Sequence, residues 1–149
     1  MALVSNKKAY HNYEIEEKLE AGIELLGHEV KSLKGGRGSL EGAYVITRGK
    51  ETFLVNMNIP PYQVGNVDKE YDPYRLRKLL LNKREIATLL GVEKEKGLTI
   101  MPLSVYNKSN KIKVEIGIAR GKKKYDKRET LKRRTAERDV EREAKSRLS

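Results

Sequence analysis

The sequence predicts a mainly β protein with short helices, an α+β fold whose strands form a small antiparallel barrel with flanking helices and a basic C-terminal tail. Apolar and polar residues alternate along several segments before Arg120, as they do in half-buried strands. Glycine, asparagine or proline separates those segments, as in turns. Both patterns end at Arg120, where basic residues become dense. In a chain of 149 residues we therefore expect one folded domain, residues 1–119, and an appendage, residues 120–149.

The first strand is predicted from Tyr13 to Leu25, after a polar and basic stretch (residues 4–11) that we expect to be extended. Its apolar positions share one face: Ile15, Leu19, Ala21, Ile23 and Leu25. Its charged positions share the other face: Glu14, Glu16, Lys18, Glu20 and Glu24. Glu17 interrupts the alternation, and Gly22 is the expected place for a bend.

A short helix and a hairpin are predicted next. Residues 27–34 carry apolar side chains three apart, which indicates a helix. Two strands, residues 43–47 and 52–57, are separated by a polar linker that contains Gly49, which indicates a β-hairpin. The pair of prolines that follows ends the second strand, because proline cannot donate a backbone hydrogen bond to a neighbouring strand.

Two helices in tandem and two long strands complete the predicted domain. Asp72 stands before a proline, which is typical of a helix N-terminus. Asn82, with a glutamate three residues later, forms a capping box for a second helix that ends at Gly91. Residues 98–106 are rich in β-forming residues, and residues 111–118 alternate between apolar and polar after a polar turn. About six strands with short helices between them are typical of the oligonucleotide-binding (OB) type of barrel.

Positive charge is concentrated at the C-terminal end. The whole chain has 32 Lys or Arg against 21 Asp or Glu, a net charge of +11. Residues 120–149 hold 13 of the basic residues against 6 acidic ones, a net of +7. Such a distribution is typical of proteins that bind nucleic acid. From charge alone, a tail that only keeps the protein soluble is an equally good interpretation, and an acidic membrane surface would attract the same residues.

Other features of the composition restrict the class of protein. No apolar run approaches the roughly 20 residues that span a bilayer, and Met1–Val4 is too short for the apolar part of a signal peptide. Without cysteine there is no disulfide framework and no thiolate metal site. We therefore expect a cytoplasmic protein.

Catalytic chemistry has little support in the sequence. The chain has two histidines, His11 and His28, and no serine stands in a strand–turn–helix elbow. The glycine-rich residues 35–38 lack the Gly-Lys-Ser/Thr ending of a phosphate-binding loop. The glutamates of the first strand are most simply a solvated face. We expect no enzymatic activity, no metal site and no cofactor.

Binding to RNA is the chemistry that remains. Eight tyrosines and one phenylalanine offer faces on which bases can stack. We assign most of them to barrel packing, but Tyr10, Tyr13 and Tyr125 lie among or close to basic residues. His11 stands among polar residues, where it could contact a phosphate or a base or be an exposed structural histidine. The tail has no continuous apolar stripe, so we expect it to be largely disordered when free and to fold on a partner.

Five blocks of sequence carry a resemblance to a known family. They are Asn6-Lys7-Lys8-Ala9, Glu20-Ala21-Gly22-Ile23, Glu29-Val30-Lys31-Ser32-Leu33, Arg77-Lys78-Leu79-Leu80-Leu81 and Ala119-Arg120-Gly121-Lys122-Lys123 through Asp126-Lys127-Arg128. In this order the blocks resemble the small protein B family, the bacterial SsrA-binding proteins that partner transfer-messenger RNA. One block alone would be a weak signal, whereas five in register are specific.

The resemblance implies an OB barrel and a function in trans-translation. The protein would grip the transfer-RNA-like part of transfer-messenger RNA and deliver it to a ribosome that has stalled without a stop codon. The RNA-binding residues implied by the resemblance are Asn6, Lys7, Lys8, His11, Tyr13 and Glu20, with Glu29, Lys31 and Ser32 close by.

The resemblance also implies a tail that enters the decoding region and the empty messenger channel of the small ribosomal subunit and becomes helical there. Its first residues are Gly121, Lys122, Lys123, Lys124, Tyr125, Asp126, Lys127 and Arg128. Tyr125 stands where some members of the family have histidine. A stacking role survives that change, whereas a role that needs a titrating imidazole does not.

Glu20 is unusual among the implied RNA-binding residues because a carboxylate repels phosphate. It can accept hydrogen bonds from base amino groups, so we predict that it contributes specificity more than affinity. The alternative is an ordinary solvated glutamate on a strand.

Two other functions remain open from the sequence alone. A generic OB-type RNA-binding or ribosome-associated protein would bind other structured RNAs about as tightly. An RNA-modifying enzyme would use an acidic site that contains Glu20 or Glu29. Under the hypothesis that we favour, a function in trans-translation, the partners are transfer-messenger RNA and the ribosome, and there is no membrane contact. The protein is expected to be a monomer.

Overall fold

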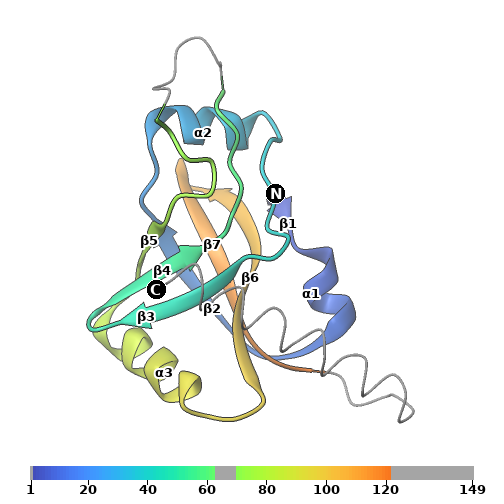
Figure 1. Cartoon of the computed structure of the whole chain (residues 1–149), viewed down its shortest axis with the longest axis vertical. Helices are drawn as coiled ribbons and strands as arrows, with labels where there is room; N and C mark the ends of the chain where they lie inside the picture. The colour runs from blue at the N-terminus through green and yellow to red at the C-terminus, as the bar shows by residue number, and fades with distance from the viewer. Residues whose placement is uncertain (1, 63–69, 122–149) are drawn as a thin grey trace.

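A computed structural model of the chain describes residues 2–62 and 70–121 (Figure 1). Seven antiparallel strands form one sheet in the order β1-β6-β7-β2-β5-β4-β3. The strands are β1 (Ala2–Ser5), β2 (Tyr13–Ile23), β3 (Tyr44–Arg48), β4 (Glu51–Val55), β5 (Arg77–Leu80), β6 (Leu98–Lys108) and β7 (Lys111–Gly121). The helices are α1 (Lys7–Asn12), α2 (Gly27–Lys34) and α3 (Lys83–Glu93). The sheet curls on itself, so that β3, at one end of this order, contacts β6 near the other end. The predicted mainly β, barrel-type fold with short helices is confirmed.

The long hairpin of β6 and β7 forms the centre of the fold. Val114, Ile116 and Ile118 alternate along β7 and are buried in the main hydrophobic core. The two strands are joined by Ser109 and Asn110, whose φ angles are 50° and 63°. A two-residue turn with two positive φ angles matches the twist of antiparallel strands, and asparagine tolerates that conformation. Both predicted strands and their turn are confirmed.

Strand β2 pairs with β7 along nearly its whole length, from Tyr13 opposite Gly121 to Gly22 opposite Lys113. The register shifts between Ile15 and Glu17, which indicates a bulge and explains why Glu17 interrupts the alternation. This irregularity in the pairing is near the start of the strand, whereas Gly22 pairs in register with Lys113 of β7 and with Leu80 of β5.

Two predictions about local structure were wrong. Of the stretch expected to be extended, Val4 and Ser5 do lie in the short strand β1, but Lys7–Asn12 form the six-residue helix α1. The first of the tandem helices does not form, because Asp72 initiates only a single turn, in which its carboxylate accepts from the backbone of Tyr74. The chain then continues as β5, whose residues pair with β2 on one side and β4 on the other. Pairing with two neighbours outweighs the helical pattern of the leucines.

The remaining elements follow the sequence patterns. Helix α2 and the hairpin of β3 and β4 form where they were predicted. The capping box of Asn82 and Glu85 starts α3, which continues two residues past Gly91. Strand β7 ends at Gly121, and Arg120 lies within it, 3.0 Å from a carboxylate oxygen of Glu16. Residues 122–149 lie outside the described part of the chain.

Candidate nucleic-acid interface

One side of strands β6, β7 and β2 points away from the core and carries charged and aromatic side chains. We define the outer face by Lys18, Glu20, Tyr106, Lys108 and Glu115, which contact one another across the three strands. Side chains alternate across a strand, so these residues are on the side opposite the buried valine and isoleucines of β7. The face is therefore held rigidly by the longest strand pairs of the sheet.

Glu20 is held by a tyrosine and a lysine from β6. The Tyr106 hydroxyl donates a hydrogen bond to Oε2 of Glu20, and the Lys108 Nζ lies 3.2 Å from the same oxygen. The hydrogen bond from Tyr106, followed by that from Lys108, lowers the pKa of the Glu20 carboxyl. Burial, together with the hydrogen bond to Glu20, raises the pKa of the Tyr106 phenol. At neutral pH the carboxylate is ionised and the phenol is its donor.

Glu115 lies directly opposite Glu20 on β7. Like charges at opposed positions of an antiparallel pair destabilise a sheet. Here the second carboxylate has its own donors: the Tyr10 hydroxyl lies 3.2 Å from Glu115 Oε1, and Lys18 Nζ lies 3.8 Å from it. The Lys18 ammonium also lies 5.4 Å from the centroid of the Tyr10 ring. Each glutamate of the pair thus has one tyrosine and one lysine partner.

Helix α1 covers one end of the outer face. Its buried residue Ala9 packs on Met101, Leu103 and Ala119. Leu103 can lie across β7 only because position 117 is a glycine: a Cβ there would come within 2.8 Å of the leucine side chain.

Asn6 anchors this helix to the sheet. Its side-chain oxygen accepts from the Ala9 backbone nitrogen at 3.3 Å, its Nδ2 donates to the Pro102 carbonyl at 2.9 Å, and its backbone nitrogen donates to the Leu103 carbonyl at 2.8 Å. Asn6 therefore caps α1 and fixes it to β6 at the same time.

The structure brings most of the predicted RNA-binding residues together at this place. Lys7, Lys8 and His11 are exposed on α1, and Lys8 forms an ion pair with Glu41. Tyr13 is half-buried at the edge of the small cluster beneath α1. Because Tyr10 of the same helix reaches Glu115, the helix and the Glu20 site form one continuous surface.

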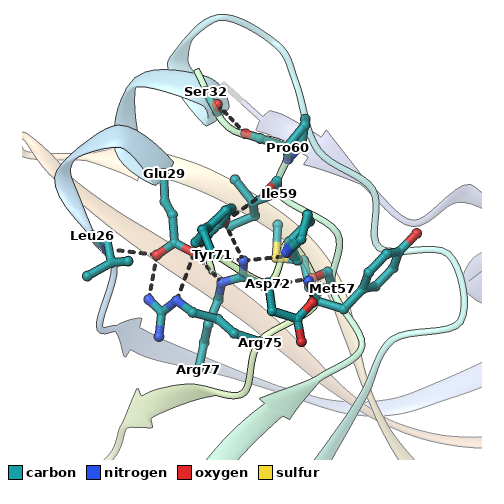
Figure 2. Close-up of polar contacts among 12 residues, drawn as sticks. Leu26, Glu29, Ser32, Met57, Ile59, Pro60, Tyr71, Asp72, Arg75 and Arg77 are labelled. Atoms are coloured by element: carbon teal, nitrogen blue, oxygen red, sulfur yellow. Dashed lines mark hydrogen bonds and ion pairs between the residues drawn. The ribbon is translucent and has the colours of Figure 1, made fainter. Parts of the chain in front are cut away.

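Glu29 lies elsewhere and is completely buried (Figure 2). Its Oε2 accepts from Arg77 Nη2 at 2.7 Å, and both its oxygens accept from Arg75. Tyr71 also donates to Oε2, at 2.9 Å, and Oε1 accepts from the backbone nitrogen of Leu26 at 2.7 Å, which caps α2. We call Glu29, Tyr71, Arg75 and Arg77 the buried network.

Arg77 is the second fully buried charge of this network. It also donates to the carbonyls of Met57, at 2.6 Å, and Pro73, at 2.9 Å. Burial by itself would raise the pKa of the Glu29 carboxyl, but the hydrogen bonds from Arg75, Leu26 and Arg77 outweigh it and lower this pKa to about 2. The pair is ionised and bonded on all sides, as a buried charge must be.

The burial of Glu29 and Ser32 changes what they can do for RNA. Ser32 is fully buried, and its hydroxyl donates to the Pro60 carbonyl at 2.6 Å (Figure 2). Neither side chain reaches the surface, so direct contact with RNA is not available to them in this fold. Of the three α2 residues expected close to RNA, only Lys31 is exposed.

Comparison with known proteins identifies the family. The SmpB protein family model matches residues 3–146. The chain belongs to the SmpB family. It is 49% identical over 146 residues to an SsrA-binding protein of Clostridium novyi (strain NT), covering 98% of this chain and 92% of the relative. It is 51% identical over 140 residues to an SsrA-binding protein of Geobacillus kaustophilus (strain HTA426), covering 94% and 90%.

A solved structure of the family has the same fold. It is described as "tmRNA-SmpB: a journey to the center of the bacterial ribosome", and its matching chain superposes with a TM-score of 0.69 at 46% identity, covering 83% of this chain and 86% of that one. The family resemblance inferred from the five sequence blocks is confirmed.

Of the eight predicted tail residues, the structure describes only Gly121. Gly121 ends β7, opposite Tyr13. The other seven lie outside the described residues: Lys122, Lys123, Lys124, Tyr125, Asp126, Lys127 and Arg128. Within residues 2–62 and 70–121, no helix is long and apolar enough to cross a membrane.

Sequence reasoning missed four polar partners in this SmpB-family fold: Tyr106, Lys108, Glu115 and Arg77. The alternation of the last strand does place Glu115 on the polar side. What the sequence lacked was the strand order, which brings β6 and β7 beside β2.

Proposed function

We propose that this SmpB-family protein binds transfer-messenger RNA and brings it to stalled ribosomes in trans-translation. The observation that carries the proposal is about half identity, over nearly the whole chain, to proteins named as SsrA-binding. The solved relative, described as a tmRNA-SmpB structure in the bacterial ribosome, supports both RNA and ribosome as partners. The protein would act as a binding protein, without catalysis, in the cytoplasm where ribosomes translate.

The folded body would hold the transfer-RNA-like part of the RNA on α1 and the outer face. Exposed lysines and His11 of α1 offer donors to phosphates, which position an RNA without reading its sequence. Glu20, on the same surface, offers a fixed acceptor to base amino groups. Tyr13 and Asn6 would support this surface through α1, and Lys31 would extend it from α2.

The basic segment after β7 would contact a second RNA surface, the decoding region and empty messenger channel of the small subunit. Residues 122–149 hold 12 basic residues against 6 acidic ones, and this net charge of +6 suits binding along a phosphate backbone. The two parts would therefore have separable tasks: the body selects the RNA, and the tail recognises the vacant ribosome.

Truncation after Gly121, the last residue of β7, tests this division. We expect the shortened protein to retain most of its affinity for the transfer-RNA-like domain, because the body is complete. In reconstituted translation of a message without a stop codon, we expect it to lose tagging of the stalled peptide. Loss of RNA binding by the truncated protein would contradict the division, and binding of unrelated structured RNAs with equal affinity by the full chain would contradict the proposed RNA partner.

A further inference from the structure

We propose that Tyr106 is a positioning residue that sets the RNA selectivity of Glu20, by fixing one oxygen of its carboxylate through a hydrogen bond. The proposal rests on the proposed function, because it assumes that RNA meets Glu20 on the outer face. The ligand group it concerns is an unpaired base that presents amino or imino hydrogens, the groups that a carboxylate accepts.

The contact between Tyr106 and Glu20 depends on the strand order. Glu20 is on β2 and Tyr106 is on β6, with β7 between them. Across β7, Glu20 is opposite Glu115, and Tyr106 is opposite Lys113. The tyrosine side chain therefore runs diagonally across the middle strand to reach the glutamate. Because both outer strands pair with β7 in a fixed register, the distance between the two side chains is set by the sheet.

Tyr106 is better suited to fix Glu20 than its other partner is. The Lys108 side chain is 60% exposed and lies at the end of β6. Its Nζ is at nearly equal distances, 3.2 and 3.3 Å, from the two carboxylate oxygens of Glu20, so it does not favour one of them. Its long flexible stem gives the ammonium many positions. A tyrosine has only two side-chain torsions, and Tyr106 is half-buried. Its hydroxyl is the contact with a defined direction.

A fixed carboxylate can select a base where a free one cannot. The Glu20 side chain is 39% exposed. Without a partner, a glutamate this exposed would have to be ordered when RNA binds, at a cost in conformational entropy. Holding it in place beforehand removes that cost only for a base whose donors match the held orientation. The Tyr106 hydroxyl occupies one acceptor position on Oε2, and the remaining lone pairs accept from the base.

The matched variants are Tyr106→Phe, Glu20→Gln and the double variant, with Tyr74→Phe as control. Phenylalanine keeps the ring, so any stacking by residue 106 is preserved and only the hydroxyl is lost. Tyr74 is 52% exposed, and its hydroxyl takes no part in the contacts of the outer face. The measurement is the dissociation constant for an ordinary transfer RNA divided by that for the transfer-RNA-like domain of transfer-messenger RNA, at one salt concentration, so that a larger ratio means stronger selection.

We expect Tyr106→Phe to reduce this ratio by about 3- to 10-fold, the usual effect of one hydrogen bond. Glu20→Gln should reduce it at least as much, and the double variant no further than Glu20→Gln alone, because Tyr106 acts through Glu20. Tyr74→Phe should behave as the unchanged protein. Carbon-detected NMR titration should show the Glu20 carboxyl pKa moving up in Tyr106→Phe, a change that general loosening of the fold would not produce.

The outcomes separate the two proposals. If Glu20→Gln leaves the ratio unchanged, RNA does not meet this face and the site in the proposed function is wrong. If Glu20→Gln lowers the ratio while Tyr106→Phe does not, the role of Tyr106 is overturned. The same holds if Tyr106→Phe lowers the ratio equally with and without Glu20. Glu20→Asp gives a second test without altering Tyr106, because the aspartate side chain is one methylene too short to reach the Tyr106 hydroxyl. Unaltered selectivity in Glu20→Asp would also overturn the proposal.

Discussion

Two glutamates that the family resemblance placed near the same RNA have opposite environments. Glu29, in the buried network, has no exposed surface and accepts from two arginines, a tyrosine and a backbone nitrogen. Glu20, on the outer face, accepts from one tyrosine and one lysine and keeps much of its surface. Both have a lowered pKa, so charge state does not distinguish them. What differs is the number of remaining acceptor sites, and only Glu20 has any to offer a ligand.

The hydrogen bonds and ion pairs of the two glutamates also differ in what they hold together. The buried network joins α2, through Glu29, to the segment that precedes β5, through Tyr71 and Arg75, and to β5 itself through Arg77. It therefore fixes parts of the chain that are more than 40 residues apart. The Glu20 contacts join strands that the sheet already holds together. The first set ties distant segments of the chain together, and the second orients a side chain.

The largest effect is expected from Glu29→Ala, which would leave Arg77 buried without its partner. Removing one member of a buried pair costs about 3–5 kcal/mol. We expect the free energy of unfolding to fall by that amount in urea titrations. Glu20→Ala is the matched control, because it removes an exposed carboxylate and should leave the free energy of unfolding nearly unchanged. If the two variants were equally stable, the distinction between the two regions would fail.

A pH titration of stability gives the next largest effect. The pKa of Glu29 is about 2 in the folded protein, below its ordinary value of 4.5. A lowered folded-state pKa means that ionised Glu29 adds stability above about pH 4.5, and that this contribution is lost as the pH falls toward 2. Its size is about 3 kcal/mol, from the linkage between pKa and stability.

The measurement is the unfolding free energy of the unchanged protein and of Glu29→Gln between pH 6 and pH 2. The unchanged protein should lose stability more steeply across this window than the variant, which has no carboxyl at this position. Parallel curves would show that the Glu29 carboxyl is not held ionised by the buried network.

The sequence predicted the elements whose signal is local. The alternation along residues 111–118 and the turn before it identify β7, and the capping residues Asn82 and Glu85 identify the start of α3. Such patterns depend on neighbours a few positions away. The family resemblance added the candidate residues of α1 and β2, which the structure brings together on one surface.

The sequence could not predict features that depend on distant partners. Strand β5 is four residues long, too short for a period of two to be recognised, and it is a strand because β2 and β4 flank it. Arg77 stands in a basic run and looks like any surface arginine, but Glu29, 48 residues earlier, buries it. The contact of Tyr106 with Glu20 spans 86 residues and follows only from the strand order.

The smallest effect is expected at Asn6, which belongs to both kinds of site. Its side chain caps α1 and binds the Pro102 carbonyl of β6, yet the family resemblance places it among the RNA-binding residues. Loss of a capping asparagine costs about 1 kcal/mol. Asn6→Ala should therefore lower the free energy of unfolding by about that much and accelerate amide exchange in α1, while it leaves the buried network intact.

The control for Asn6→Ala is Lys7→Ala, which removes an exposed cation from the same helix without removing its cap. Lys7→Ala should leave stability unchanged and lower the slope of RNA affinity against salt by about one unit, as expected for a lost phosphate contact. Asn6→Ala should weaken RNA binding with an unchanged salt slope, because it displaces the helix that carries the cations and removes none of them. If Asn6→Ala weakened RNA binding while stability and amide exchange in α1 stayed as they were, Asn6 would contact the RNA itself, and its anchoring of α1 would be incidental to binding.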